Sequence, residues 1–142
     1  MYRSVYIATV LVLAALLPGC ESMKSMTGST SDLTGLLTKQ LGVTENQDDG
    51  GVGSMLQLAK EKLTAGDFDS VAKAIPGSQK YLDTAKQLLG GSKVGDASGL
   101  QSAFSKLGMS PDMVNKFKPI VVEYGGQVGG PQVKSLLQTA LA

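Results

Sequence analysis

The only cysteine of the chain, Cys20, has the most specific chemistry and position of any residue. It follows an apolar run from Val5 to Leu17, which is preceded by one basic residue, Arg3. This run is shorter than the about 20 residues that a permanent membrane-spanning helix needs. A short basic start followed by such a run is typical of a secretory signal peptide. We therefore expect residues 1–19 to be a leader, with the thiol of Cys20 directly after it.

The residues around the expected cleavage site indicate what happens to this thiol. Leu17, Pro18, Gly19 and Cys20 resemble the bacterial lipobox, in which a leucine stands three positions before the cysteine and a small residue directly precedes it. The resemblance implies that the thiol is diacylglycerylated, that the chain is cut before Cys20, and that the new amine is acylated (palmitate). Two or more acyl chains anchor a protein stably, since each buried methylene contributes about 0.8 kcal/mol. The alternatives are a free thiol after an ordinary signal peptide and a short membrane helix.

The residues after the cysteine indicate where the anchor lies. The bacterial signal for retention in the inner membrane usually has Asp at the second mature position, and this chain has Glu21 there. We therefore expect a lipoprotein of the bacterial cell envelope, anchored to the outer membrane and facing the periplasm. Residues 20–30 are small and polar, and we interpret them as the lipidated cysteine and a flexible tether that reaches on the order of 20 Å.

Two absences narrow the chemistry of the mature chain. The sequence contains no histidine, and acylation of Cys20 would leave no thiolate. A zinc site, a Ser-His-Asp triad and a Cys-His pair are therefore excluded by the residue types present. The chain has 13 basic and 12 acidic residues, and loss of Arg3 with the leader balances them. No basic excess points to nucleic acid, and we predict no metal and no cofactor.

The remaining polar patterns do not amount to a catalytic site. The acidic pairs Asp48–Asp49 and Asp67/Asp69 lack the spacing of a calcium loop, and we interpret them as helix caps and as charges that complement helix dipoles. Ser70 and the lysine three residues later, Lys73, have Ser-Lys dyad spacing, but we expect both to face solvent. The glycine-rich stretches "GGSKVG" and "GGQVGG" lack the spacing of a phosphate-binding loop. We therefore predict no catalytic residue.

The elements that would position any site are predicted to be helices. Apolar residues recur at helical spacing throughout residues 31–142, and no long stretch alternates between apolar and polar residues. We predict an all-α fold, a single compact domain of about six to seven helices. The glycine-rich segment Gly90–Gly99 is expected to link two halves, 31–89 and 100–142. We also expect helix ends at Gly66 and within Gly125–Gly130, and a kink at Pro119.

A weak internal repeat supports the division into halves. The segment "LGVTENQ" begins at Leu41 and "LGMSPDM" begins at Leu107. In each, a leucine-faced helix ends at Leu-Gly and a hydroxyl residue opens the next helix. An ancient duplication would give two pseudo-repeated halves. The alternative is that Leu-Gly followed by Ser or Thr is simply a common way to end one helix and begin the next.

Several segments resemble one known family. "LLTKQLGVTENQ", "GGVGSMLQLAKEKL", "DFDSVAKAIPG" and "LGMSPDMV" are similar to the VcgC/VcgE-like family of bacterial lipoproteins, and more distantly to the YidB-like helical fold. The likeness covers most of Asp32 to Ala142. It implies an all-helical domain. It carries no established activity, so no catalytic residue is transferred to this chain.

Large, soft side chains are concentrated in the second half and suggest a candidate groove. Met109, Met113, Phe117 and Tyr124 could line an adaptable binding surface, and core packing is the alternative. We therefore expect a non-catalytic binding or interaction module, with an envelope protein or an apolar ligand as partner and the membrane bound through the anchor. The alternatives are a purely structural envelope protein without a specific ligand, and a hydrolase-type enzyme that uses carboxylates or Ser/Lys. A deep pocket with two carboxylates, one with a raised pKa, would favour the enzyme.

Replacing Cys20 with serine tests the anchor. Intact-mass measurement of the wild-type protein should show a chain that begins at Cys20 and carries acyl groups, whereas Cys20→Ser should carry none, because the hydroxyl does not replace the thiol as acceptor. If the two proteins differ only by the exchange of sulfur for oxygen, with the leader present in both, the lipobox prediction is wrong.

Overall fold

Six helices make up the part of the chain that the computed structural model describes, residues 30–142. They are α1 (Thr30–Leu41), α2 (Glu45–Lys62), α3 (Ala65–Ala74), α4 (Ser78–Leu88), α5 (Ala97–Lys106) and α6 (Met113–Ala140). These residues contain no strand, so the predicted all-α domain of six to seven helices is confirmed. None of the described helices combines the length and apolar character that crossing a membrane requires. The predicted leader, the lipobox at Leu17–Cys20 and most of the tether lie outside the described residues.

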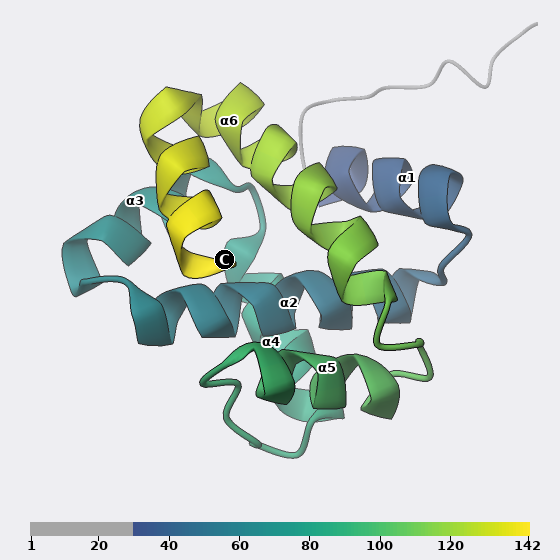
Figure 1. Ribbon diagram of the computed structural model, residues 1–142. Helices are drawn as coiled ribbons and strands as arrows, with labels where there is room; N and C mark the ends of the chain where they lie inside the picture. The colour runs from purple at the N-terminus through teal and green to yellow at the C-terminus, as the bar shows by residue number, and fades with distance from the viewer. Residues whose placement is uncertain (1–29) are drawn as a thin grey trace, which may run out of the picture.

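Helix α2 occupies the centre of the domain. It packs against all five other helices, and Figure 1 shows it crossing the molecule with α1 and α6 on one side and α4 and α5 on the other. Every residue from Asp48 to Leu56 is buried. A helix buried all round is ordinarily apolar all round, whereas this segment contains two aspartates and three glycines. Its burial therefore depends on close packing more than on apolar side chains.

The three glycines of α2 allow its neighbours to approach closely. A methyl group added at Gly53 would lie 1.9 Å from the carbonyl oxygen of Tyr81 in α4, and one added at Gly51 would lie 2.7 Å from the ring of Phe117 in α6. Glycine in a helix interior costs about 1 kcal/mol relative to alanine. That local cost is offset because the absent side chains bring α4, α5 and α6 against the α2 backbone.

The start of α2 is fixed by the capping box that "TENQ" predicts. The Thr44 hydroxyl accepts from the Gln47 backbone N–H, and the Gln47 side-chain oxygen accepts from the Thr44 backbone N–H. The Gln47 amide nitrogen also donates to the backbone oxygen of Leu107, over 3.2 Å. The cap therefore also fixes the end of α5 relative to α2.

Three predicted helix boundaries differ from the structure. Thr64, not Asp67, is the N-cap of α3, and Gly66 lies inside that helix. Asp67 instead accepts a hydrogen bond from the Thr64 hydroxyl over 2.8 Å. The predicted linker Gly90–Gly99 is shorter, because Asp96 caps α5 by accepting from the Gly99 N–H, and Gly99 itself is helical.

Helix α6 runs farther than the sequence suggests. Its backbone stays helical through Pro119 and the glycines that follow, and the single non-helical residue inside it is Gly130, with φ 81° and ψ −177°. The break expected within Gly125–Gly130 is thus confirmed at the last glycine, directly before Pro131, and Pro119 keeps helical backbone angles. A methyl group at Gly125 would clash with Leu137, so this glycine lets the two parts of α6 pack together. The predicted cap at Ser110 is also corrected, since Asp112 is the N-cap residue.

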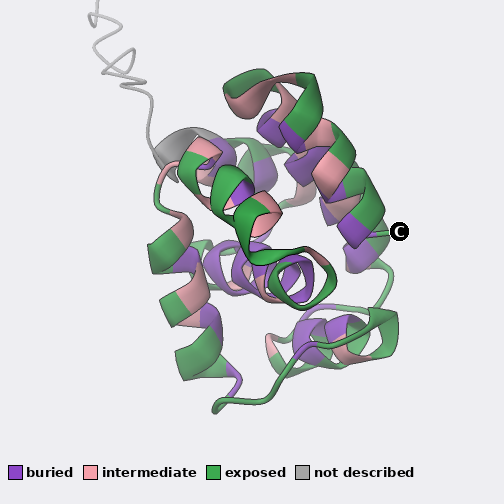
Figure 2. Cartoon of the chain, turned by 90° about the vertical axis from the view of Figure 1, so that its left-hand side faces the viewer, coloured by how far each residue is buried: buried purple, intermediate pink, exposed green. Residues whose placement is uncertain are grey.

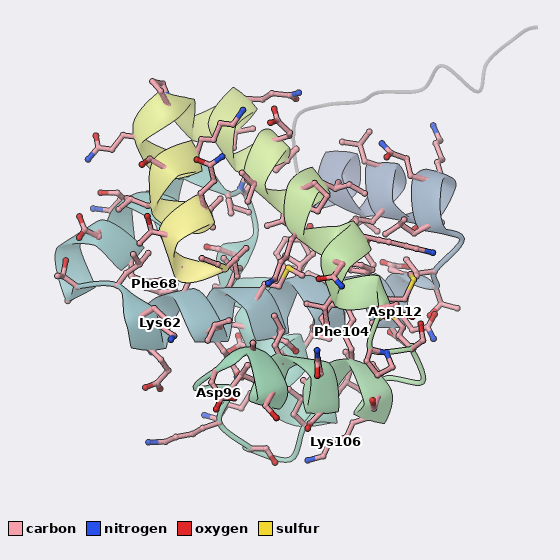
Figure 3. All side chains as sticks on the ribbon, viewed as in Figure 1. Lys62, Phe68, Asp96, Phe104, Lys106 and Asp112 are labelled. Atoms are coloured by element: carbon pink, nitrogen blue, oxygen red, sulfur yellow. The ribbon has the colours of Figure 1, made fainter. Side chains whose placement is uncertain are left out.

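The core is contiguous through both predicted halves. Figure 2 shows the buried faces of the helices turned toward the centre and their exposed faces turned outward. Phe104 of α5 meets Phe117 of α6 edge to face, with ring centroids 5.0 Å apart. In Figure 3, Phe104 and Lys106 leave the same helix toward opposite sides. Because α2 packs against α5 and α6 as well as α1, residues 30–142 form one domain.

The two Leu-Gly junctions of the proposed repeat share a backbone conformation. Gly42 after α1 has φ 66°, and Gly108 after α5 has φ 78°. This left-handed region is the one that glycine adopts without strain. A common helix-end motif would give the same result as a duplication, so the duplication stays a prediction.

Alanine at Gly53 should separate α2 from α4. The new methyl group has no room beside a backbone carbonyl, so we expect Gly53→Ala to lower the free energy of unfolding by at least about 3 kcal/mol or to prevent folding. The matched control is Gly35→Ala inside α1, where nothing lies within 4 Å of the added carbon. Chemical denaturation should show the control to be more stable than wild type by about 0.5–1 kcal/mol. Equal effects at the two sites would contradict the packing described here.

Candidate functional site

The four residues predicted to line a groove do not line one together. Met109 and Phe117 are buried in the core, and Met113 is partly buried and packs against it. Tyr124 is 6 % exposed and borders a different groove. The reason is that this side of α6 faces α2 and α5, where Phe117 packs on Phe104 and against Gly51. Most of this face therefore packs in the core, which is the alternative that the sequence left open.

A groove does exist between α1 and α6. Its volume is about 600 Å³, within the range of sites that hold a drug-sized ligand or a cluster of side chains. Its lining combines apolar side chains with amides and charged groups, and Leu36 in its wall is 38 % exposed. It is lined by Leu36, Gln40 and Leu41 of α1 and by Asn115, Lys116, Pro119, Ile120, Glu123, Tyr124 and Gln127 of α6. The sequence did not reveal this groove because its two walls come from helices that are far apart in the sequence.

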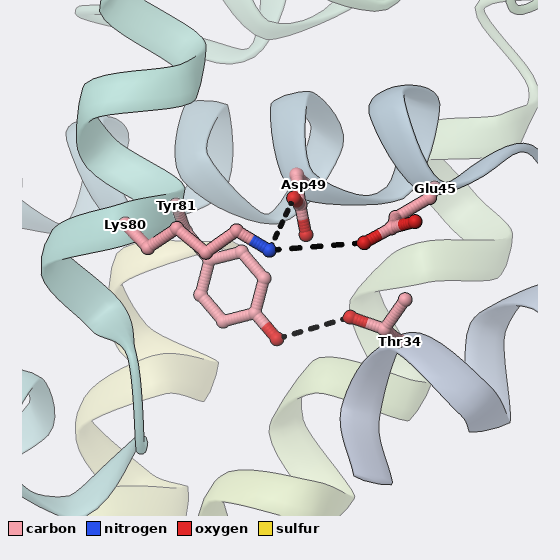
Figure 4. A network of polar contacts seen from close by, with 5 residues as sticks. All are labelled: Thr34, Glu45, Asp49, Lys80 and Tyr81. Carbon is pink, nitrogen blue, oxygen red and sulfur yellow. Dashed lines mark hydrogen bonds and ion pairs between the residues drawn. The ribbon is translucent and has the colours of Figure 1, made fainter. Parts of the chain in front are cut away.

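Beside α1 lies a second feature, a buried polar cluster at the first turns of α2. Asp48 is fully buried and Asp49 is 4 % exposed. Asp49 forms an ion pair with Lys80 of α4, with a distance of 2.9 Å between Oδ2 and Nζ. Figure 4 shows that Lys80 also faces Glu45, and that the Tyr81 hydroxyl shares a hydrogen bond with the Thr34 hydroxyl of α1 over 3.3 Å. The cluster thus connects α1, α2 and α4.

Asp48 is the unusual member of this cluster. Neither of its carboxylate oxygens has a well-oriented hydrogen bond within the described residues. Burial raises the pKa of Asp48 to about 7, from an ordinary value of 3.8. The charges of Asp49 and Glu45 raise this pKa further, whereas the nearby Thr34 hydroxyl and Lys80 oppose the shift. Desolvation is the largest cause, so Asp48 is protonated below neutral pH.

The two α4 residues near Asp48, Lys80 and Tyr81, also have raised pKa values. Burial raises the pKa of the Tyr81 phenol, which keeps it neutral and able to donate. The hydrogen bond to Asp49 raises the pKa of Lys80, which keeps the amine charged. Lys80 is therefore committed to Asp49, and Asp48 has no cation of its own.

Two carboxylates with one raised pKa belong to the pattern that would favour an enzyme, but these two are buried and lie outside the α1/α6 groove. Asp48 presents no surface to a substrate, Asp49 is paired with Lys80, and neither lines the α1/α6 groove. Within the described residues, no three Asp, Glu, His or Cys side chains are grouped so that they could hold a metal ion. The cluster is better explained as a structural junction.

The Ser-Lys spacing in α3 does not form a dyad. The Ser70 hydroxyl donates to the backbone oxygen of Gly66 over 3.1 Å, and Lys73 forms an ion pair with Asp69 at 2.6 Å. The side chains of Lys73 and Asp69 are 76 % and 60 % exposed. The expectation that these residues face solvent is confirmed.

Comparison with known proteins yields one match. A family model described as protein of unknown function VcgC/VcgE matches residues 18–142, which include Cys20 and every described residue. No curated protein and no solved structure matches the chain.

The buried carboxyl should make stability depend on pH. The pKa of Asp48 is raised in the folded state, so its contribution to stability is complete below pH 3.8 and is lost as pH rises through about 7. We expect the free energy of unfolding to fall by about 2 kcal/mol between pH 5.5 and 8. No histidine titrates in this window, because the chain has none. Chemical denaturation at the two pH values measures the change.

Asparagine at Asp48 should remove this dependence, because the amide keeps the shape without the charge. At pH 8 we expect Asp48→Asn to be more stable than wild type. The matched control is Asp112→Asn, at an exposed N-cap residue without a side-chain cap hydrogen bond. It should keep the wild-type dependence. A wild-type protein whose stability is the same at both pH values would contradict the assignment.

Proposed function

The chain belongs to the VcgC/VcgE family of proteins of unknown function, and we propose that it is a lipid-anchored, non-catalytic binding module of the bacterial cell envelope. In this proposal Cys20 carries the anchor in the outer membrane, and the α1/α6 groove holds an apolar segment of another envelope protein. The observation that carries the proposal is the groove itself, in which apolar side chains lie exposed between two helices.

The lining of the groove favours a protein segment over a small apolar molecule. Leu36, Pro119 and Ile120 offer apolar contact, while Gln40, Asn115 and Gln127 supply amides that can donate and accept hydrogen bonds. Lys116 and Glu123 add one charge of each sign. An amphipathic segment presents apolar side chains together with polar groups at its edges, and this mixed lining matches both.

The proposed anchor lies close to the groove in the chain. Helix α1, which forms one wall, begins at Thr30, about ten residues after Cys20. A polar tether of that length keeps its ends within on the order of 20 Å. The groove would therefore bind its partner near the membrane surface. This restricts the partner to proteins of the same membrane or of the adjoining periplasm.

Site-specific photo-crosslinking in intact envelopes tests the groove. A photoreactive residue in place of Leu36, which is 38 % exposed in the groove wall, should give a discrete adduct with an envelope protein. The matched control is the same replacement at Leu88, which is 46 % exposed at the end of α4 and does not line this groove. It should give no such adduct.

A second change makes the test specific. Ile120→Gln places a polar amide on the opposite wall and should reduce the Leu36 adduct at least fivefold while leaving the protein folded, because Ile120 is only partly buried. Equal adducts from both leucines would indicate contact without a site. No adduct from Leu36 would favour the purely structural alternative.

A further inference from the structure

The surroundings of Asp48 compensate its negative charge only in part. From α2 it faces Glu45 and Asp49, which carry the same charge, and from α4 it faces Lys80 and Tyr81. Lys80 is paired with Asp49. From α1 the facing group is Thr34, which has no charge. Tyr124 of α6 adjoins Tyr81 on the far side of the cluster.

Ionisation of Asp48 therefore requires a change in its neighbours. A fully buried carboxylate without donors is costly, and the cost is relieved by water, by a new donor or by movement of a helix. The Thr34 hydroxyl is an uncharged donor beside Asp48, but it shares a hydrogen bond with Tyr81. Recruiting Thr34 to the charge would weaken the contact between α1 and α4.

Of the two helices that face Asp48, α1 is the less firmly held against α2. Helix α4 is held against the backbone of α2 at Gly53. It is connected at its start to α3 and at its end to the loop before α5. Helix α1 packs mainly against α2 and α6, and residues 42–44 are its only covalent connection to the rest of the domain. Its separation would break no other helix pair.

We propose that α1 is a cover whose closure depends on the protonation of Asp48, so that ionisation of Asp48 releases α1 from α2 and α6 and widens the α1/α6 groove. The inference rests on the proposed function only for the role of the groove. Release would expose Leu33 and Leu37, both fully buried in the closed domain. The open form would thus offer a larger apolar surface to a partner at alkaline pH than in mildly acidic surroundings.

Hydrogen exchange of the full-length lipidated chain in lipid nanodiscs tests the release. The exchange rate of the α1 amides, divided by the intrinsic rate at each pH, should rise about thirtyfold from pH 5.5 to 8. This value assumes that the pKa of Asp48 is about 7 when α1 is closed and returns to 3.8 when α1 opens. The amides of α4 serve as the internal reference and should exchange much more slowly than those of α1 at both pH values, because α4 is expected to open only when the whole domain unfolds. Equal opening free energies for α1 and α4 would indicate that α1 opens only in global unfolding and would overturn the proposal.

Three variants complete the test. Asp48→Asn should hold α1 exchange constant within about twofold over the same range, and Asp112→Asn should reproduce wild type. If Asp48→Asn still shows the rise, Asp48 is not the trigger. Thr34→Val removes the hydroxyl and leaves every ionisable group in place, so it should raise the exchange rate of the α1 amides at pH 5.5. An unchanged rate would show that the Thr34–Tyr81 hydrogen bond does not hold α1 closed.

Crosslinking at both pH values separates this inference from the proposed function. Release of α1 without any Leu36 adduct would support the proposal that α1 is a cover and would contradict the binding role. A Leu36 adduct with no pH-dependent exchange of α1 would support the binding role and contradict the cover.

Discussion

The first two turns of α2 impose the constraint on which the rest of the domain depends. Between Asp48 and Gly53 the helix is enclosed on all sides, and the absence of a side chain at Gly53 brings the α4 backbone into direct contact. Tyr81 and Phe117 both lie against this stretch of backbone, at Gly53 and Gly51. The glycines weaken the isolated helix and strengthen the assembled domain, so α2 depends on its neighbours for its own stability.

The same constraint explains the buried acids. Residues in the first turns of α2 are enclosed whatever their type, and carboxylates there benefit from the positive end of the helix dipole. Asp49 is compensated by Lys80, whereas Asp48 is compensated mainly by keeping its proton. A buried polar junction of this kind contributes little net stability. Its effect is to make the position of α1 sensitive to a single proton, next to the groove that α1 forms with α6.

Periodicity and capping were sufficient to predict the helical class and much of the helix order. The capping box at Thr44 was predictable because both of its partners lie within four residues. The role of Gly50, Gly51 and Gly53 was not, because a glycine that weakens a helix and a glycine that admits a neighbour look the same in sequence. The burial of Asp48 and the α1/α6 groove were missed for a related reason, since both arise from contacts between distant helices. Local rules did place the break in α6, which occurs at Gly130 within the expected Gly125–Gly130 segment.

The position of Asp48 at the enclosed centre, without donors, is the claim from which the structural junction and the mobile cover both follow. Carbon-13 NMR of the Asp48 carboxyl group in the folded chain measures its titration directly. This account predicts a midpoint close to pH 7, well above the ordinary aspartate value of 3.8. A midpoint near pH 4 would place the carboxyl in contact with water or with a donor, and would contradict it.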